Sequence, residues 1–158
     1  MHAKTNESEM PFALASRKGD IDMKTILIPI DGTERSKKSV NLVVDLYRPD
    51  EVEVVVLAVR EDVEWMRTEQ DFSEARSAIQ PTLDEIVAKM SDYKVRTLVS
   101  FGRAGEEILY TADVENVDII VMTKSTRGGW YRMIGSVTAH VVKYAQCVVT
   151  IVPEIGNG

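Results

Sequence analysis

The sequence predicts an α/β fold in which five parallel strands form one sheet and helices cover both of its faces. Three observations lead to this prediction. Five short runs are apolar and rich in β-branched residues, amphipathic helical patterns separate them, and the two kinds of segment alternate along the chain. Such alternation is typical of a doubly wound sheet with right-handed crossovers. The length of 158 residues suits one domain.

The five strand candidates are almost continuously hydrophobic, whereas a strand with one wet face alternates between apolar and polar residues. This pattern indicates strands that are covered on both faces, as in a parallel sheet. The runs are residues 25–30, 52–59, 95–101, 117–123 and 147–152.

Two helices are expected after the first two strands. Thr33 is placed to cap the first of them. That helix is expected to bury Val40, Val43, Val44 and Tyr47. The second, over residues 72–91, carries an apolar stripe of Ala75, Ile79, Leu83, Ile86, Val87 and Met90. Pro81 falls inside this pattern and predicts a kink or a later start.

Two shorter helices are expected in the second half of the chain. Residues 104–115 present Ile108, Leu109 and Ala112 as an apolar stripe, and residues 136–144 present Val137, Val141 and Tyr144. Gly102 and Gly105 are expected to end the third strand and to cap the helix that follows it.

The bulk composition argues against several classes of protein. A net charge of −6 disfavours a general binder of nucleic acid or of anionic membranes, because both need a broad basic face. Cys147 is the single cysteine, so we expect no disulfide within the chain and a reducing, cytoplasmic environment. No apolar run approaches the roughly 20 residues that a membrane-spanning helix needs.

The two ends of the chain are expected to lie outside the domain. Residues 1–22 are mixed and polar and form an N-terminal extension, residues 23–153 form the domain, and residues 154–158 form a C-terminal tail. Disorder is one interpretation of the extension, and docking of Phe12 and Leu14 onto an apolar groove or a partner is the other.

A ligand site is expected where the strand order reverses, since open α/β sheets bind ligands at the carboxyl ends of their strands. For the order 3-2-1-4-5 the reversal lies between strands 1 and 4. Strand 1 runs into Asp31, and strand 4 ends at Met122 and Thr123. Asp31 is a candidate acceptor for a ribose or an adenine, and its alternative role is in the turn with Gly32 or as a helix cap.

The segment that follows strand 4 has features of an anion site. Residues 119–153 contain no Asp or Glu, and Gly135-Ser136-Val137-Thr138 opens a helix with free N–H groups and two hydroxyls. Ordinary capping explains the same residues equally simply. Lys124, Arg127 and Arg132 either screen phosphate charge or keep an exposed loop solvated.

Catalytic residues are not apparent. The sequence has no nucleophile elbow and no cluster with metal-ligand spacing. His140 is expected to be a partly buried helix residue, and Cys147 is expected to pack in the core. Trp130 and Tyr131 either stack on a base or pack a loop against the domain.

Three separated segments resemble the universal stress protein family in the family's own order. They are "ILIPIDGTERSKKSV" at the first strand, "GRAGEEILYTADVENVDIIVM" around the third helix and fourth strand, and "IGSVTAHVVKYAQCVVTIVP" at the end. The similarity covers residues 23–153. It implies a five-stranded sheet of order 3-2-1-4-5 with a Rossmann-like nucleotide site. It also implies a homodimer paired through the last strand: Cys147, Val148, Val149, Thr150, Ile151 and Val152.

The ATP-binding members of this family carry the pattern G-x2-G-x9-G-[ST], and this chain departs from it. Gly135-Ser136 matches the last pair, whereas Met122 and Ser125 stand where the first two glycines belong. The resemblance implies a set of nucleotide-binding positions: Ile30, Asp31, Val59, Met122, Thr123, Ser125, Gly135, Ser136, Val137 and Thr138.

These observations favour a dimeric, cytoplasmic stress-response regulator that binds ATP or AMP weakly. The alternative is a nucleotide-free dimeric interaction module of the same family. An enzyme, at most a slow ATP hydrolase, is the third hypothesis, and it lacks a recognisable base or metal site. Neither nucleic acid nor a membrane is expected as a partner.

Overall fold

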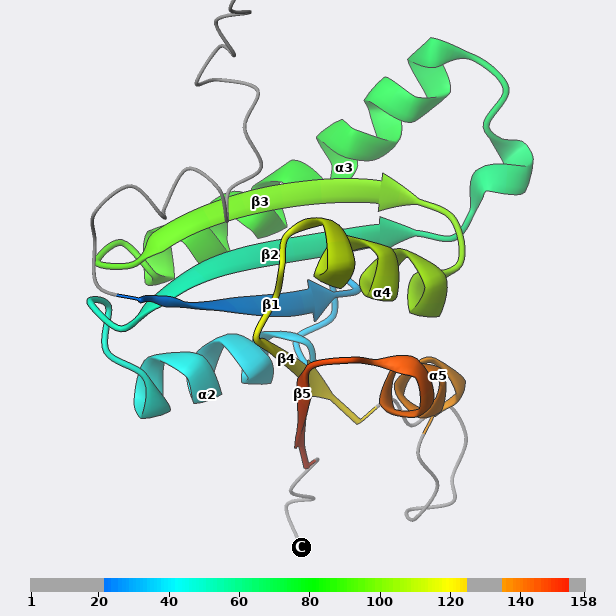
Figure 1. Cartoon of the computed structure of the whole chain (residues 1–158). Coiled ribbons are helices and arrows are strands. Elements are labelled where there is room, and N and C mark those ends of the chain that lie inside the picture. The colour runs from blue at the N-terminus through cyan, green and yellow to red at the C-terminus, as the bar shows by residue number, and fades with distance from the viewer. Residues whose placement is uncertain (1–21, 125–134, 154–158) are drawn as a thin grey trace, which may run out of the picture.

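The computed structural model describes residues 22–124 and 135–153. Five strands form a parallel sheet of order β3-β2-β1-β4-β5 (Figure 1). The strands are β1 (Lys24–Ile30), β2 (Val52–Arg60), β3 (Lys94–Phe101), β4 (Ile119–Thr123) and β5 (Val148–Val152). The predicted fold class and strand order are therefore confirmed, and the strand boundaries differ from the expected ones by at most two residues.

The helices lie on both faces of the sheet (Figure 1). They are α2 (Lys37–Leu46), the short 3₁₀ helix η2 (Val63–Trp65), α3 (Glu69–Lys89), α4 (Ala104–Val114) and α5 (Ser136–Tyr144). The core is split accordingly: α2 and α3 pack on one face of the sheet, and α4 and α5 pack on the other.

The central strand β1 shows why its sequence is apolar after the first two residues. Successive side chains of a strand point to opposite faces, so Ile26 and Ile28 pack with α2 and α3, and Leu27 packs with α4 and α5. All three side chains have no exposed surface. Both faces of β1 are covered from Ile26 to Ile28, and only Lys24, at the start of the strand, is exposed to water.

Two helices begin elsewhere than expected. Thr33 shapes the turn before α2, where its Oγ1 accepts the Ser36 N–H at 3.4 Å, and α2 itself begins only at Lys37. The later start predicted for the second helix is wrong, since α3 runs from Glu69 through Pro81. A capping box explains the early start: the hydroxyl of Thr68 accepts the Asp71 N–H, and the Asp71 carboxylate accepts the Thr68 N–H.

Several side chains are more exposed than the helical patterns predicted. Val44, Val87 and Tyr144 are all exposed, whereas their neighbours Val40, Ile86 and Val141 are buried. Each exposed residue lies beside the buried stripe of its helix and not within it. The stripes are therefore narrower than a count of apolar residues suggests.

Gly105 does not cap α4, because the cap position is Arg103 and Gly105 lies within the first turn. Gly105 is buried, and a Cβ added to it would lie 2.7 Å from Cδ2 of His140. Its missing side chain lets α4 and α5 approach closely. Gly102 follows β3 as expected, with a positive φ of 148°.

The extension 1–21 with Phe12 and Leu14, the tail 154–158, and the loop residues Arg127, Trp130, Tyr131 and Arg132 lie outside the described residues. Among the residues that the structure describes, no helix is both long and apolar enough to cross a membrane.

Candidate functional site

A cavity opens where strands β1 and β4 separate. β1 pairs with β2 along its whole length, from Lys24 to Ile30, but its pairing with β4 stops at Leu27. Two residues later comes Pro29, which has no N–H to donate to a ladder. The carboxyl ends of β1 and β4 are therefore free to bound a space between them, at the point where the strand order reverses.

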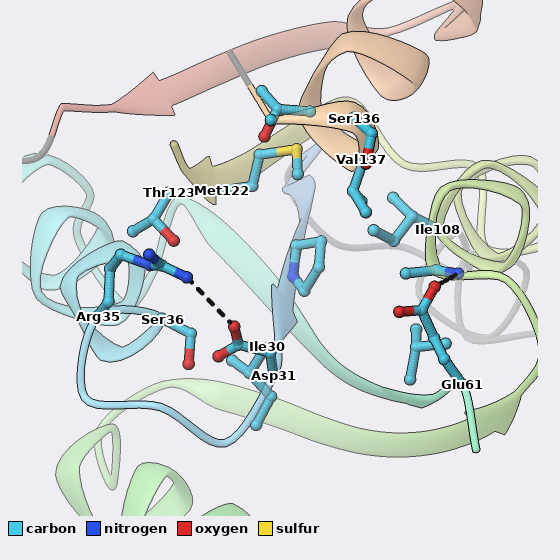
Figure 2. Close-up of a pocket in the computed structure, with 15 residues that line it drawn as sticks. Ile30, Asp31, Arg35, Ser36, Glu61, Ile108, Met122, Thr123, Ser136 and Val137 are labelled. Atoms are coloured by element: carbon cyan, nitrogen blue, oxygen red, sulfur yellow. Dashed lines mark hydrogen bonds and ion pairs between the residues drawn. The ribbon is translucent and has the colours of Figure 1, made fainter. Parts of the chain in front are cut away.

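The cavity has a volume of ≈ 290 Å³, at the lower end of the range of about 300–1,000 Å³ for small-molecule sites. It lies between the starts of α4 and α5, over the carboxyl end of β1 (Figure 2). Its lining residues are Pro29, Ile30, Asp31, Arg35, Ser36, Val59, Glu61, Ala104, Ile108, Met122, Thr123, Gly135, Ser136, Val137 and Thr138.

The structure brings together nine of the ten site residues that the sequence analysis named. Ile30, Asp31, Val59, Met122, Thr123, Gly135, Ser136, Val137 and Thr138 all line this one cavity. The tenth, Ser125, lies outside the described residues.

The apolar part of the lining comes from both strands and helices. Met122 is only 5% exposed, packs in the core with Leu27 and Val141, and still reaches the cavity. Val59 and Ile108 contribute further apolar surface. This part of the cavity suits the flat apolar face of a ring, because such a face needs contact and no hydrogen bonds.

The start of α5 provides the polar part. Its cap residue Gly135 is extended, with φ −61° and ψ 158°, and no side chain caps the helix within the described segments. The N–H groups of the first turn and the positive end of the helix dipole therefore face the cavity without an internal anion. Figure 2 shows Ser136 and Val137 at this edge of the cavity.

Thr138 adds a second, independent polar group. The residue has no exposed surface and lines the cavity, and its Oγ1 has no hydrogen-bond partner among the residues that the structure describes. A buried hydroxyl without a partner costs about 1–3 kcal/mol. The fold thus keeps an unsatisfied donor beside a free helix start, which is the arrangement that an anionic ligand would satisfy.

Asp31 takes part in the turn after β1. Its Oδ1 accepts the N–H of Thr33 at 3.0 Å and the Thr33 hydroxyl at 2.6 Å, and its Oδ2 lies 3.7 Å from Nη2 of Arg35. Gly32 between them has a φ of +81°, which glycine adopts without strain. The turn interpretation of Asp31 is therefore correct, and it leaves the carboxylate on the cavity wall.

The surroundings of Asp31 keep it ionised. Partial burial by itself raises the pKa of Asp31, but hydrogen bonds from Thr33 and Ser36 and the charge of Arg35 together bring it below its ordinary value of 3.8. The carboxylate is an acceptor at neutral pH.

Glu61 brings a second carboxylate to the cavity from the loop after β2. Its Oε1 accepts the N–H of Ala104 at 2.9 Å, so the Glu61 carboxylate occupies the start of α4. Neither Glu61 nor Arg35 was among the site residues predicted from the sequence. Each had a signal: Glu61 follows the end of β2 much as Asp31 follows β1, and Arg35 lies four residues after Asp31.

Neither of the two candidate nucleophiles or bases belongs to this cavity. Cys147 packs beside the core, where burial and the carboxylates of Asp113 and Asp118 raise the pKa of its thiol, so the reactive thiolate is disfavoured. His140 is half-buried and lies 4.9 Å from Tyr144 between ring centres. Within residues 22–124 and 135–153, no three His, Cys, Asp or Glu side chains cluster as metal ligands.

Two solved structures at low identity share the fold of this chain. A universal stress protein in complex with cAMP is 17% identical with a TM-score of 0.60, covering 83% of this chain and 97% of its own. The universal stress protein from Archaeoglobus fulgidus in complex with dAMP is 16% identical with a TM-score of 0.59, covering 82% and 96%.

Comparison with more similar proteins decides the family. The solved structure of hypothetical protein MJ0577 is 25% identical with a TM-score of 0.73, covering 87% of this chain and 100% of its own. Universal stress protein Sll1654 from Synechocystis sp. (strain ATCC 27184 / PCC 6803 / Kazusa) is 31% identical over 144 residues, covering 85% of this chain and 88% of its own length. The family model described as the universal stress protein family matches residues 23–153. The chain therefore belongs to the universal stress protein family.

Proposed function

We propose that the cavity binds an adenine nucleotide weakly and that the chain acts as a stress-response regulator whose nucleotide-bound state is the signal. In this proposal Asp31 and Val59 hold the adenosine part, and Ser136 and Thr138 at the start of α5 hydrogen-bond the phosphate. Asp31 directly follows β1 and Val59 belongs to β2, whereas Ser136 and Thr138 belong to the first turn of α5, and all four line the cavity.

The unpaired hydroxyl of Thr138 carries this proposal. It is fully buried, it lines the cavity, and it adjoins a helix start that no described side chain caps. The cap position is Gly135, so Thr138 is not a capping residue. A phosphate oxygen would supply an acceptor at this point. The two structural relatives in complex with cAMP and dAMP support an adenine nucleotide as the ligand class.

Weak binding is expected because of Met122. A glycine there would let backbone N–H groups approach a phosphate closely, whereas the Met122 side chain packs in the core and takes up part of the cavity wall. This same observation favours the second candidate function, a nucleotide-free interaction module in which protein side chains occupy the crevice.

Titration calorimetry with AMP, ATP, adenosine and pyrophosphate tests the proposal. We expect AMP to bind in the micromolar to millimolar range, more weakly as salt is added because the phosphate interaction is screened. Ser136→Ala should weaken AMP about fivefold and leave adenosine unchanged. If no adenine ligand gives heat at millimolar concentration, the interaction-module function replaces this one.

We also propose that two copies pair through β5. This strand is the edge of the sheet, carries no charged residue, and exposes 61% of Val148. A bare apolar edge favours pairing with a second strand. Light scattering at micromolar concentration should give about twice 17.7 kDa, and Thr150→Pro should weaken the dimer because it removes a backbone donor. A wild-type monomer would contradict the pairing.

A further inference from the structure

The charges around the cavity are unevenly distributed. Both carboxylates, Asp31 and Glu61, lie on the side formed by the ends of β1 and β2, whereas the free helix start of α5 lies on the other side (Figure 2). Of the described residues that line the cavity, only Arg35 is a cation, and it is paired with Asp31. A nucleotide would therefore lie with its phosphate at α5 and its base toward the carboxylates.

Glu61 differs from Asp31 in what remains available to a ligand. The Oδ1 atom of Asp31 accepts two bonds from Thr33, and its Oδ2 faces Arg35. In the described segments, Glu61 accepts one hydrogen bond, at Oε1 from the N–H of Ala104. Figure 2 shows the second oxygen of Glu61 on the cavity side of that bond.

No cation neutralises Glu61 within the described part of the chain. The adjacent Arg60 bonds instead to Asp62, at 2.7 and 3.1 Å, and to the Ala75 carbonyl at 3.1 Å. The start of α4 holds the Glu61 carboxylate in place through one N–H and leaves its other oxygen as a fixed, negatively charged acceptor.

We infer that Glu61 determines which base the cavity accepts, and that it selects bases with an exocyclic amino group over bases with a carbonyl at the same position. The inference rests on the proposed nucleotide function. A fixed carboxylate oxygen accepts a hydrogen bond from the N6 amino group of adenine. It repels the O6 carbonyl of hypoxanthine, since two acceptors then face each other without a proton between them.

The pair AMP and IMP tests this inference, because the two share ribose and phosphate and differ at the base edge. Wild type should bind AMP about 10-fold more tightly than IMP. That ratio is well below the roughly 10⁴-fold of a fully buried polar site, because Glu61 is exposed to solvent.

Glu61→Gln is the informative variant. The amide oxygen can still accept the Ala104 N–H, so the start of α4 stays capped, while the amide N–H₂ now faces the cavity as a donor. The AMP-to-IMP ratio should fall to within about twofold or invert. Glu106→Gln is the matched control. Glu106 lies in the first turn of α4, which Glu61 contacts, but it pairs with Arg103 and does not line the cavity.

The outcomes separate this inference from the proposed function. A ratio that falls in Glu61→Gln and stays at the wild-type value in Glu106→Gln supports base selection. Equal binding of AMP and IMP by wild type, or equal weakening of both in Glu61→Gln, overturns it and leaves nucleotide binding intact. If wild type binds neither nucleotide, the proposed function fails, and base selection fails with it.

Discussion

Buried polar groups differ between the side of the sheet formed by the amino ends of the strands (the amino edge) and the side formed by their carboxyl ends (the carboxyl edge). In the part of the chain that the structure describes, they are paired at the amino edge and unpaired at the carboxyl edge. At the amino edge, Glu53 is ion-paired with Lys94 and Glu115 is ion-paired with Arg96. These are the two carboxylates that are buried among the described residues. At the carboxyl edge, within residues 22–124 and 135–153, the buried hydroxyl of Thr138 has no partner and the start of α5 has no side-chain cap.

This difference supports the proposed ligand site at the carboxyl edge. A buried charge without a partner would cost several kcal/mol, so the amino edge holds together only because each charge is matched. An unsatisfied hydroxyl costs less, and a fold tolerates it where a ligand later provides the partner. Stability should therefore depend on the amino edge, and ligand binding should depend on the carboxyl edge.

Breaking an ion pair at the amino edge should have the largest effect. Arg96→Met leaves Glu115 buried without its partner, and we expect a loss of about 3 kcal/mol in the free energy of unfolding at pH 7. Urea unfolding measures this loss, and the affinity for AMP should change less than twofold. Replacing both partners, as Arg96→Met with Glu115→Leu, should recover most of the stability. A single-variant loss below about 1 kcal/mol would contradict the comparison.

Moving α5 should affect both stability and binding. In Gly105→Ala the new Cβ would lie 2.7 Å from Cδ2 of His140, so α4 and α5 are pushed apart. Overpacking costs about 1–3 kcal/mol and the better helix propensity of alanine returns up to about 1, which leaves a net loss of about 1 kcal/mol.

The same variant should weaken AMP binding about threefold, since the start of α5 moves with the helix. Adding His140→Ala removes the clash and should restore both properties. Retention of wild-type affinity by Gly105→Ala would show that the position of α5 does not matter for binding.

The smallest expected effect concerns Asp31. Its folded-state pKa lies below its ordinary value of 3.8, so the stability it contributes is present above about pH 4 and is lost as the pH falls through the folded pKa. Asp31→Asn keeps an oxygen for Thr33 and loses the charge. The difference in unfolding free energy between wild type and variant should be at most about 0.5 kcal/mol, because Asp31 is half exposed.

Urea unfolding from pH 7 to pH 3 measures the Asp31 contribution. The difference between the two proteins should stay constant down to about pH 5 and shrink below pH 4. A difference that grows at low pH would mean that the Asp31 charge is unfavourable in the folded state.

Most of the fold was predictable because the strands are covered on both faces. Such strands produce near-continuous apolar runs, and the runs at residues 25–30 and 52–59 reappear as β1 and β2 almost unchanged. The start of α3 was less predictable, because Thr68 and Asp71 form a capping box upstream of the apolar stripe. The capping box depends on two polar residues, and the spacing of apolar residues does not reveal it.

The site was predictable at the ends of strands and at the Gly135-Ser136 helix start. Asp31 and Thr123 were found in the first way and the start of α5 in the second, and all of them line the cavity. Glu61 directly follows β2, so the strand-end rule would have included it. Its contact with Ala104 was not predictable, because it joins a loop to a helix 43 residues away in the chain. Which side chains meet across such a distance depends on packing, which the local pattern of a single sequence does not encode.

Replacing Thr138 by valine tests most directly whether the unpaired hydroxyl serves a ligand. Valine has the same shape without the hydroxyl, so Thr138→Val should raise the free energy of unfolding by about 1 kcal/mol and weaken AMP binding about 10-fold. Thr111→Val is the control, because Thr111 is also buried and does not line the cavity, and it should leave AMP binding unchanged. A Thr138→Val protein that is less stable than wild type and binds AMP equally well would contradict the account.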